Sequence, residues 1–584
     1  MKYSNYDKFP SVPVAGFSDA CVAGWPDCLG RLKKSLQSVS ARKKILVVEC
    51  YPGVDEAALY QLLRDQLAPE LILWSKDALL SPEKIQSLVE PCLGGNDPVF
   101  GFLSELNLPA FFDASRLATL RQQVADIDSG LVIILGCGAR QIAAGDIFVY
   151  ADLARWEAQN RFRRHETGNL GADNQHDPAN LLYKRAFFVD WRVADRWKRP
   201  LIAAWDFVLD THRFAEPKLA AGEAVRQGLK QALTRPFRVV PFFDPAPWGG
   251  QWMKEVCDLP RDVANYGWCF DCVPEENSLV LDFNGLKLEL PALDLVFYQP
   301  QSLLGEKVFA RFGDEFPIRF DLLDTMSGGN LSLQVHPLAE YIRQHFGMAY
   351  TQDESYYLLD AAENASVYLG FRGDLKKDEF LHDLTEAQAG RKAFPTTQHI
   401  CQWPARKHDH FLIPAGTVHC SGANSVVLEI SATPYIFTFK LWDWARLGLD
   451  GKPRPISLDH GIANIEWARK NGWLEKNLIN RLEPLGSGDG WREEKTGLHE
   501  LEFIETRRHW FTRPVLHHTH GGVNVINLVE GEAAVVESPT NAFAPFTVHY
   551  AETFIIPATV GEYRIRPLKP DQPTATLKAF VRTS

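Results

Sequence analysis

The stretch NLSLQVHP (330–337) carries the pattern on which the fold assignment depends. Leu333 and Val335 alternate with Gln334 and His336, which is the period-two pattern of a strand with one apolar face. Because successive side chains of a strand point to opposite faces, Gln334 and His336 share a face. An amide oxygen and an imidazole nitrogen placed in this way can approach one metal ion together.

Two further candidate ligands follow at later apolar strands. Glu354 opens ESYYLLD (354–360), and His419 follows the Pro-x-Gly turn of PAGTVHC (414–420). A lone histidine is more often a surface residue or a satisfied core residue than a metal ligand. Here, however, two histidines, an acid and an amide recur at strand ends, and together they form a mixed nitrogen and oxygen set that suits zinc.

Several short words of the sequence carry a family resemblance. They are Trp248-Gly249-Gly250, Leu303-Leu304-Gly305, LSLQVHP (331–337), ESYYLLD (354–360), VYLGF (367–371), FLIPAGTVH (411–419) and LWDWARLGLDGKPRP (441–455). These words resemble class I mannose-6-phosphate isomerase, of the cupin superfamily, over about residues 235–584.

The resemblance implies an all-β double cupin, made of two jelly-roll barrels with a few helices. It also implies one Zn²⁺ per chain, held by Gln334, His336, Glu354 and His419. The implied activity is the interconversion of mannose 6-phosphate and fructose 6-phosphate.

Two positions beside the candidate ligands depart from the family pattern. The resemblance places an active-site lysine at Gln352 and an active-site arginine at Lys440. Lys440 keeps a positive charge without the bidentate fork of arginine, whereas Gln352 removes a charge. We expect Lys440 to be catalytic, and Gln352, Arg319 and Arg446 to contribute to substrate binding. The changes leave open an isomerase acting on a different sugar, or a sensor that binds sugar phosphate without turnover.

The end of the sequence offers a second histidine group, His517-His518-Thr519-His520. The later word Ile556-Pro557-Ala558 is followed by Thr-Val-Gly and by no histidine. We therefore expect a surface-exposed cluster on a C-terminal barrel that holds no metal.

The first part of the chain has a different texture, in which strands alternate with helices. This alternation predicts a mostly parallel α/β sheet. We expect strands at Lys44–Glu49, Leu71–Trp74, Leu131–Leu135 and Ile147–Tyr150, and a helix whose first N–H groups are capped by Asp55.

The layout of this α/β domain weakly resembles a uridine-kinase-like P-loop domain. The loop ECYPGVDE (49–56) has no Gly-Lys-Ser/Thr, and it carries acids where a phosphate would lie. We expect no nucleotide binding and no kinase activity, although a third alternative is that this domain phosphorylates a sugar. Scaffolding, oligomerisation or ligand sensing are its other expected roles.

Composition sets the remaining expectations. We expect three domains, at 1–220, 221–460 and 461–584, because 584 residues exceed one ordinary core. The net charge of −11 argues against nucleic acid as a partner, and no apolar run is long enough to span a bilayer. The ten scattered cysteines indicate reduced thiols, so we expect a cytoplasmic protein. The small sugar phosphate expected as its partner is what the family resemblance implies.

Overall fold

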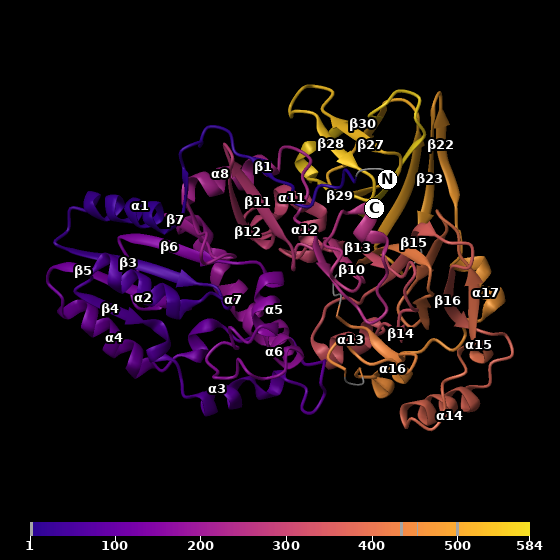
Figure 1. Cartoon of the computed structure of the whole chain (residues 1–584), viewed down its shortest axis with the longest axis horizontal. Helices are drawn as coiled ribbons and strands as arrows, with labels where there is room; N and C mark the ends of the chain where they lie inside the picture. Colours follow the sequence, from indigo (N-terminus) through magenta and orange to yellow (C-terminus); the bar gives the residue numbers. More distant parts are fainter. Residues whose placement is uncertain (1–3, 433–435, 452–453, 498–500, 584) are drawn as a thin grey trace. The chain divides into compact units, whose positions relative to one another are not determined.

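A computed structural model describes residues 4–432, 436–451, 454–497 and 501–583, and they form two compact units. One unit comprises Ser11–Ala232 and Ser278–Tyr298, and we call it the parallel-sheet unit. The other comprises Met1–Pro10, Leu233–Asn277 and Gln299–Ser584, and we call it the double-barrel unit. Figure 1 labels the elements of both.

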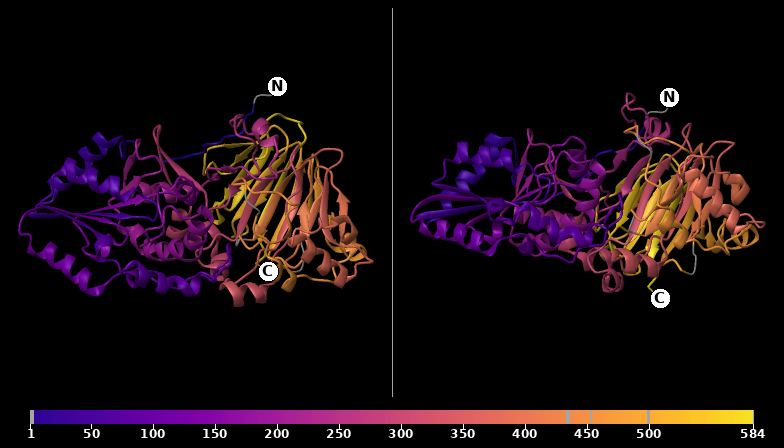
Figure 2. Two further views of the ribbon diagram at one scale, coloured as in Figure 1. Left: turned by 60° about the horizontal axis from the view of Figure 1, so that its bottom comes forward. Right: turned by 90° about the horizontal axis from the view of Figure 1, so that it is seen from below.

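The parallel-sheet unit is built on a seven-stranded sheet in the order β2-β8-β7-β6-β3-β5-β4. The strands from β7 to β4 are parallel to one another, whereas β8 runs antiparallel to β7 and β2 runs antiparallel to β8. Helices lie on both faces of the sheet (Figure 2). The strands are β2 (Cys21–Ala23), β3 (Lys43–Cys50), β4 (Leu71–Trp74), β5 (Gly130–Gly136), β6 (Ile147–Asp152), β7 (Phe207–Asp210) and β8 (Lys218–Ala221). The helices are α1 (Trp25–Ser38), α2 (Glu56–Leu67), α3 (Pro82–Val89), α4 (Ala114–Asp126), α5 (Arg155–Arg163), α6 (Ala179–Arg185), α7 (Trp191–Lys198), α8 (Gly222–Ala232) and α10 (Leu293–Tyr298).

Local sequence patterns correctly predict four strands and one helix cap of this unit. The four predicted strands lie within β3, β4, β5 and β6. The apolar side chains of β6 and of the carboxyl-terminal parts of β3 and β5 are buried because helices cover both faces of the sheet, whereas most of those of the edge strand β4 are half-buried. The Asp55 carboxylate accepts a hydrogen bond from the Ala58 N–H at 2.9 Å and caps α2.

A hairpin distant in sequence completes the parallel-sheet unit. Strands β11 (Ser278–Phe283) and β12 (Leu286–Pro291) pair with each other, and β1 (Val12–Pro13) joins β11. We expected β11, β12 and α8, but not β1, in the cupin part of the chain. The alternating pattern predicts the hairpin, but burial of Leu279 and Leu288 against this unit is set by tertiary packing.

The first residues of the chain, in turn, belong to the double-barrel unit, although we expected them in the α/β domain. Tyr6 is buried, and its hydroxyl donates to the Asp271 carboxylate at 2.6 Å. Arg238 lies between Asp271 and Glu552, at 2.8 Å from the latter. This buried polar network fixes the N-terminal segment, and no local sequence pattern indicates it.

The first barrel is an eight-stranded jelly roll formed by β13 to β20. Two sheets face each other, with the orders β18-β15-β20-β13 and β17-β16-β19-β14. Strands β10 and β9 extend the first sheet beyond β13, and β21 extends the second sheet beyond β14. The strands are β9 (Phe242–Asp244), β10 (Trp268–Cys272), β13 (Ile318–Asp324), β14 (Leu333–Val335), β15 (Glu354–Ala361), β16 (Ser366–Phe371), β17 (Ile400–Pro404), β18 (His410–Ile413), β19 (His419–Ser421), β20 (Ser425–Ala432) and β21 (Phe439–Trp442).

The second barrel repeats this topology. Its sheets have the orders β29-β26-β31-β24 and β28-β27-β30-β25, so β24 to β31 correspond one by one to β13 to β20. The strands are β22 (Glu483–Gly488), β23 (Trp491–Gly497), β24 (Ile504–Phe511), β25 (Val515–His518), β26 (Asn524–Glu530), β27 (Ala533–Glu537), β28 (Phe546–His549), β29 (Thr553–Ile556), β30 (Glu562–Pro567) and β31 (Thr574–Val581). The predicted pair of jelly-roll barrels is therefore present.

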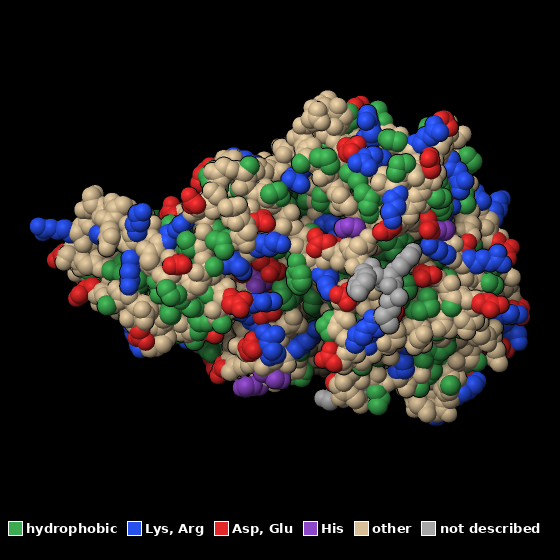
Figure 3. Space-filling view, turned by 45° about the horizontal axis from the view of Figure 1, so that its top comes forward, with side chains coloured by type: hydrophobic (Ala, Val, Ile, Leu, Met, Phe, Trp, Pro, Cys, Tyr) green, Lys and Arg blue, Asp and Glu red, His purple; other side chains and the backbone are tan. Residues whose placement is uncertain are grey.

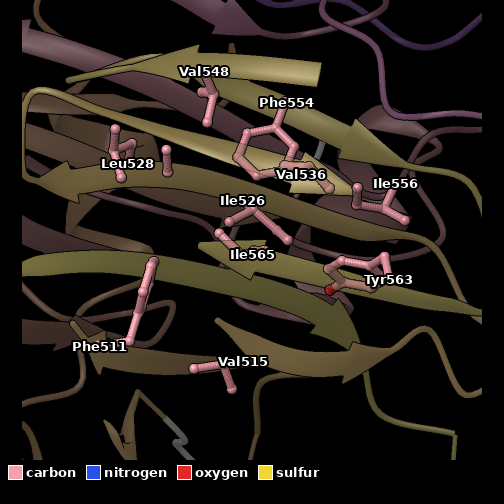
Figure 4. Packing of buried hydrophobic residues seen from close by; sticks show 11 residues of the cluster. Phe511, Val515, Ile526, Leu528, Val536, Val548, Phe554, Ile556, Tyr563 and Ile565 are labelled. Atoms are coloured by element: carbon pink, nitrogen blue, oxygen red, sulfur yellow. The ribbon is translucent and has the colours of Figure 1, made fainter. Parts of the chain in front are cut away.

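Helices of the double-barrel unit lie in the connections between strands. They are α9 (Trp252–Val256), α11 (Pro300–Leu304), α12 (Glu306–Phe312), α13 (Ala339–Phe346), α14 (Lys377–Gln388), α15 (Thr396–His399), α16 (Leu458–Ala463) and α17 (Asn471–Asn477). The core of the second barrel contains Phe511, Ile526 and Ile565, which point inward from both sheets (Figure 4).

Charged side chains of both signs are interspersed over the face shown in Figure 3. They do not form one large basic patch on that face.

Candidate metal centre

Three strands of the first barrel bring the predicted ligands together. Gln334 on β14 is the direct partner of His419 on β19, and His336 follows β14. Glu354 is the first residue of β15 in the opposite sheet. All four side chains are buried in the interior of the barrel.

The ligand atoms lie close enough to share one ion. Glu354 Oε1 is 2.7 Å from His419 Nε2 and 3.1 Å from His336 Nε2. The terminal nitrogen of the Gln334 amide lies 3.3 Å from His419 Nε2. Rotating that amide by 180° places its oxygen there instead, because the two amide orientations have the same shape.

Backbone carbonyls fix the tautomers of both histidines. His336 Nδ1 lies 3.0 Å from the Phe437 carbonyl oxygen, and His419 Nδ1 lies 2.8 Å from that of Thr417. A carbonyl oxygen can only accept, so each Nδ1 carries the proton and each neutral ring turns an Nε2 lone pair towards Glu354. In metal-ligating histidines, the ring nitrogen that does not bind the metal typically donates a hydrogen bond in this way.

The arrangement of Glu354, His336 and His419 calls for a positive charge between the carboxylate oxygen and the two imidazole nitrogens. Oε1 of Glu354 and Nε2 of His336 have no hydrogen-bond partner among the described residues. Burial lowers the pKa of His336, but the Glu354 carboxylate outweighs burial and raises it. Burial likewise raises the pKa of Glu354, and the two imidazoles outweigh it and hold that pKa well below its usual range. A divalent cation among these donors would satisfy all of them, so the residues fit a metal ion.

A tight turn places His419. Gly416 has a φ of +85°, and its N–H donates to the His336 carbonyl at 3.0 Å. An added Cβ would lie 2.8 Å from the Glu466 side chain and 3.0 Å from the Asn464 carbonyl oxygen. The turn therefore needs glycine both for its conformation and for space.

Lys440 lies beside the candidate ligands, at the position where the family resemblance places an active-site residue. It is the direct partner of Gln334 across β14 and β21, so its side chain shares the face of the metal ligands. Burial and the positive charge of Arg454 lower the pKa of Lys440 to about 8. No hydrogen bond or ion pair engages its ammonium group within the described part of the chain.

The three predicted substrate-binding residues occupy different environments. Gln352 donates to Glu354 Oε2 at 3.3 Å, and its own oxygen has no hydrogen-bond partner among the described residues. Arg319 is buried in the same barrel against Asp321 and Glu429. Arg446 is held by Asp443 at 2.6 Å and by a backbone carbonyl. Gln352 is thus at the site, whereas the two arginines are already committed to carboxylates.

Two further interior residues were not singled out by sequence reasoning. Tyr356 lies two residues after Glu354 on the same strand face, and its ring is 5.7 Å from that of His419. Its hydroxyl has no hydrogen-bond partner in the described residues. Glu429 is its direct partner on β20. The period-two spacing from Gln352 through Glu354 to Tyr356, and an acid within the apolar strand SVVLEISA (425–432), were the available signals.

The second barrel has the same topology as the first but has other residues at the positions of the candidate ligands. Across β25 and β30 the pair that corresponds to Gln334 and His419 is His517 and Tyr563. Glu354 corresponds to Asn524, since each opens its strand.

The registers agree with this correspondence. Glu354 and Asn524 face Ile413 and Ile556, each of which begins an Ile-Pro-Ala word. Asn524 accepts a hydrogen bond from the Tyr563 hydroxyl at 2.8 Å, where the first barrel has a carboxylate and an imidazole. Among the described residues, His336, Glu354 and His419 are the only metal-sized group of three such side chains.

One expectation for the second barrel was wrong. His517 was expected at the surface, but it is 7% exposed and stacks on the Tyr563 ring. Val515 and His517 point into the barrel, while His518 and His520 are exposed, because β25 alternates between interior and solvent.

Comparison with known proteins gives matches of two kinds, two curated relatives and one family model. The chain is 26% identical over 234 residues to mannose-6-phosphate isomerase ManA of Bacillus subtilis, covering 40% of this chain and 69% of that protein. It is 25% identical over 217 residues to mannose-6-phosphate isomerase of Streptococcus mutans, covering 37% and 63%. These relatives are enzymes. Residues 24–234 match a family described as a domain of unknown function (DUF8485), so the kinase-like resemblance stays a prediction.

A solved structure is also similar. The crystal structure of mannose 6-phosphate isomerase from Bacillus subtilis aligns with 59% of this chain and 99% of that chain, at 18% identity and a TM-score of 0.48. The described helices include none with the length and apolarity needed to cross a membrane. In sequence, the chain is similar to mannose-6-phosphate isomerases over about 40% of its length.

Proposed function

We propose that the double-barrel unit is a metal-dependent aldose–ketose isomerase that interconverts mannose 6-phosphate and fructose 6-phosphate. The observation that carries the proposal is the inward set of His336, Glu354 and His419, whose lone pairs converge on one point. Similarity to mannose-6-phosphate isomerases supports the choice of reaction and substrate.

In this proposal His336, Glu354 and His419 hold one Zn²⁺, with the amide oxygen of Gln334 as a further ligand. When bound, the ion polarises the substrate oxygens and stabilises the negative charge that develops during enolisation. The carbonyls of Phe437 and Thr417 keep both imidazoles in the ligating tautomer. Burial of the ligands excludes water from the reacting atoms.

Lys440 is proposed as the proton-transferring residue. Its ammonium group lies on the ligand face, and its pKa of about 8 lets it release and regain a proton near neutral pH. Gln352, whose oxygen has no partner among the described residues, is proposed to bind a substrate hydroxyl.

The phosphate would lie on the basic side of the site. Arg454 is 2.8 Å from Asp443, which also binds Arg446, so the three form one network next to Lys440. Two arginines share one carboxylate there, and this leaves net positive charge for a dianionic group. We propose that Arg446 acts as part of this network. We propose that Arg319 holds the Glu429 side chain in position in the barrel interior.

A non-catalytic sugar-phosphate sensor is the second candidate. It is favoured by Gln352, because this uncharged residue stands where the resembling family has a charged active-site lysine. The two candidates agree on metal binding and differ only in turnover.

A coupled assay that follows fructose 6-phosphate separates them. The isomerase proposal predicts turnover of mannose 6-phosphate by the purified chain with stoichiometric metal. Stoichiometric metal without turnover of any hexose phosphate would support the sensor and reject the isomerase.

A further inference from the structure

A cavity lies in the parallel-sheet unit, whereas the chemistry proposed above belongs to the double-barrel unit. It encloses about 810 Å³ at the carboxyl ends of β3, β4 and β5. The chain leaves β3 towards β4 and β5 on one side and returns to β6 on the other, so this is the point where the strand order reverses. Open parallel sheets bind their ligands at such a point, and the volume is that of a small-molecule site.

The wall of the cavity formed by residues 165–176 is firmly built. The Asn169 amide nitrogen donates to Asp190 at 2.8 Å, and the Leu170 N–H donates to the same carboxylate oxygen at 3.2 Å. Asn174 accepts from the Asn169 N–H at 2.9 Å. A Cβ at Gly168 would lie 2.7 Å from the Asn174 oxygen, so the loop closes on itself too tightly for a larger residue.

The position of a phosphate in a P-loop is occupied here by carboxylates. Asp55 caps α2 and so uses the donors that would bind an anion. Glu56 accepts from the Trp74 indole N–H at 2.5 Å and from the Cys137 N–H at 2.9 Å. These hydrogen bonds hold the Asp55 and Glu56 carboxylates in place, and the two carboxylates together repel a polyphosphate.

The cations of the cavity wall do not restore an anion site. Lys76 Nζ lies 3.3 Å above the centre of a Trp74 ring, and Arg116 donates to the Leu79 carbonyl at 2.9 Å. Glu166 and Asp173 add two more carboxylates to the wall, so acids outnumber lysine and arginine. Apolar side chains such as Val54 and Leu170 line the remainder.

We propose that this cavity binds an uncharged polyhydroxyl molecule of sugar size, and not a nucleotide. Hydroxyl groups can donate to the carboxylates and accept from Lys76 and from the other N–H groups of Arg116, so they match a wall of mixed donors and acceptors. A neutral ligand also avoids the repulsion that a phosphate would meet. This site is independent of the isomerase centre and gives the parallel-sheet unit a ligand-sensing role.

The test uses the full-length chain and a panel of neutral hexoses, pentoses and hexitols, with ATP and inorganic phosphate for comparison. Isothermal titration should show binding of at least one neutral member, and neither ATP nor phosphate should compete with that binding. Hydrogen exchange with that ligand should slow at 52–57, 74–82 and 165–176, which locates it in this cavity and not at the metal centre.

Ala172→Trp fills the cavity, since Ala172 lines it, and should weaken the binding at least ~10-fold. Ala125→Trp, at an exposed position of α4 outside the lining, is the matched control and should leave binding unchanged. His336→Ala should also leave it unchanged, which separates this site from the isomerase proposal.

Three outcomes would overturn the proposal. They are binding of ATP in this cavity, exchange protection confined to the barrels, and no binding by any neutral member of the panel. The titration of the unmodified chain decides the last of these even if Ala172→Trp does not fold.

Discussion

At the scale of single residues, the candidate centre depends on which nitrogen of each histidine carries a proton. The carbonyls of Phe437 and Thr417 leave the Nε2 atoms of His336 and His419 facing the same Glu354 oxygen. Three acceptors that converge in a buried space are stable only with a cation or an extra proton between them.

The first prediction concerns these ligands. His336→Ala and His419→Ala should each abolish metal retention, because the remaining donors cannot close the coordination shell. Metal content after gel filtration, measured by mass spectrometry, checks this. His345→Ala removes a partly exposed histidine of α13 and should keep the metal. Full metal content in both ligand variants would refute the assignment.

The second prediction separates metal binding from turnover. Lys440→Ala should keep the metal and lower kcat by roughly 10²-fold or more, because it removes a proton-transferring group and no ligand. Lys476→Ala, at an exposed position of α17, serves as the control and should keep full activity. Unchanged kcat in Lys440→Ala would remove Lys440 from the mechanism.

At the scale of elements, the sequence predicted the strands better than their partners. The alternation in LSLQVHP and the buried run KILVVE (44–49) each lie in a strand, as predicted. The alternating pattern of β11 and β12 is also typical of a hairpin. It does not indicate which unit the hairpin joins, because the same apolar face can pack against either core. The first ten residues were misplaced for a similar reason, since Tyr6 reaches its partner Asp271 only in the folded chain.

The candidate site shows the same limit. The positions of Gln334, His336, Glu354 and His419 followed from motif spacing. Glu429 did not, because it reaches the site through the register of β15 and β20, which no local pattern determines.

The third prediction tests the turn before β19. Gly416→Ala should destabilise the chain by about 1–3 kcal/mol and weaken metal binding, because the residue combines positive φ with close neighbours. Gly390→Ala shares a positive φ of 69° but has open space around it, so it should cost less and keep the metal. Equal effects of the two variants on metal affinity would show that the turn does not position His419.

At the scale of the whole molecule, one fold appears twice in the double-barrel unit and carries different chemistry each time. The first barrel has Glu354 and His419 where the second has Asn524 and Tyr563. A neutral hydrogen bond replaces a group that needs a cation, so we expect one metal ion for the two barrels.

The fourth prediction concerns acid stability. His410 is fully buried, and burial together with the charge of Arg508 lowers its pKa to about 3. A histidine with a depressed folded pKa contributes stability that is complete above its unfolded value near 6.5 and is lost as the pH falls towards 3.

Between these values the free energy of unfolding should fall by up to ~1.4 kcal/mol per pH unit from this residue. Urea unfolding of the full chain from pH 7 to 4 measures the slope. His410→Leu should reduce the slope, whereas His345→Leu should not. An unchanged slope in His410→Leu would mean that His410 is not the titrating group.

Metal-dependent isomerase activity is tested most directly by titrating metal into the stripped full-length chain and following the rate of mannose 6-phosphate isomerisation. Turnover should be absent without metal, rise in proportion to bound Zn²⁺ and saturate at one ion per chain. Turnover that persists in the stripped chain, or one bound ion with no turnover of any hexose phosphate, would contradict the proposal.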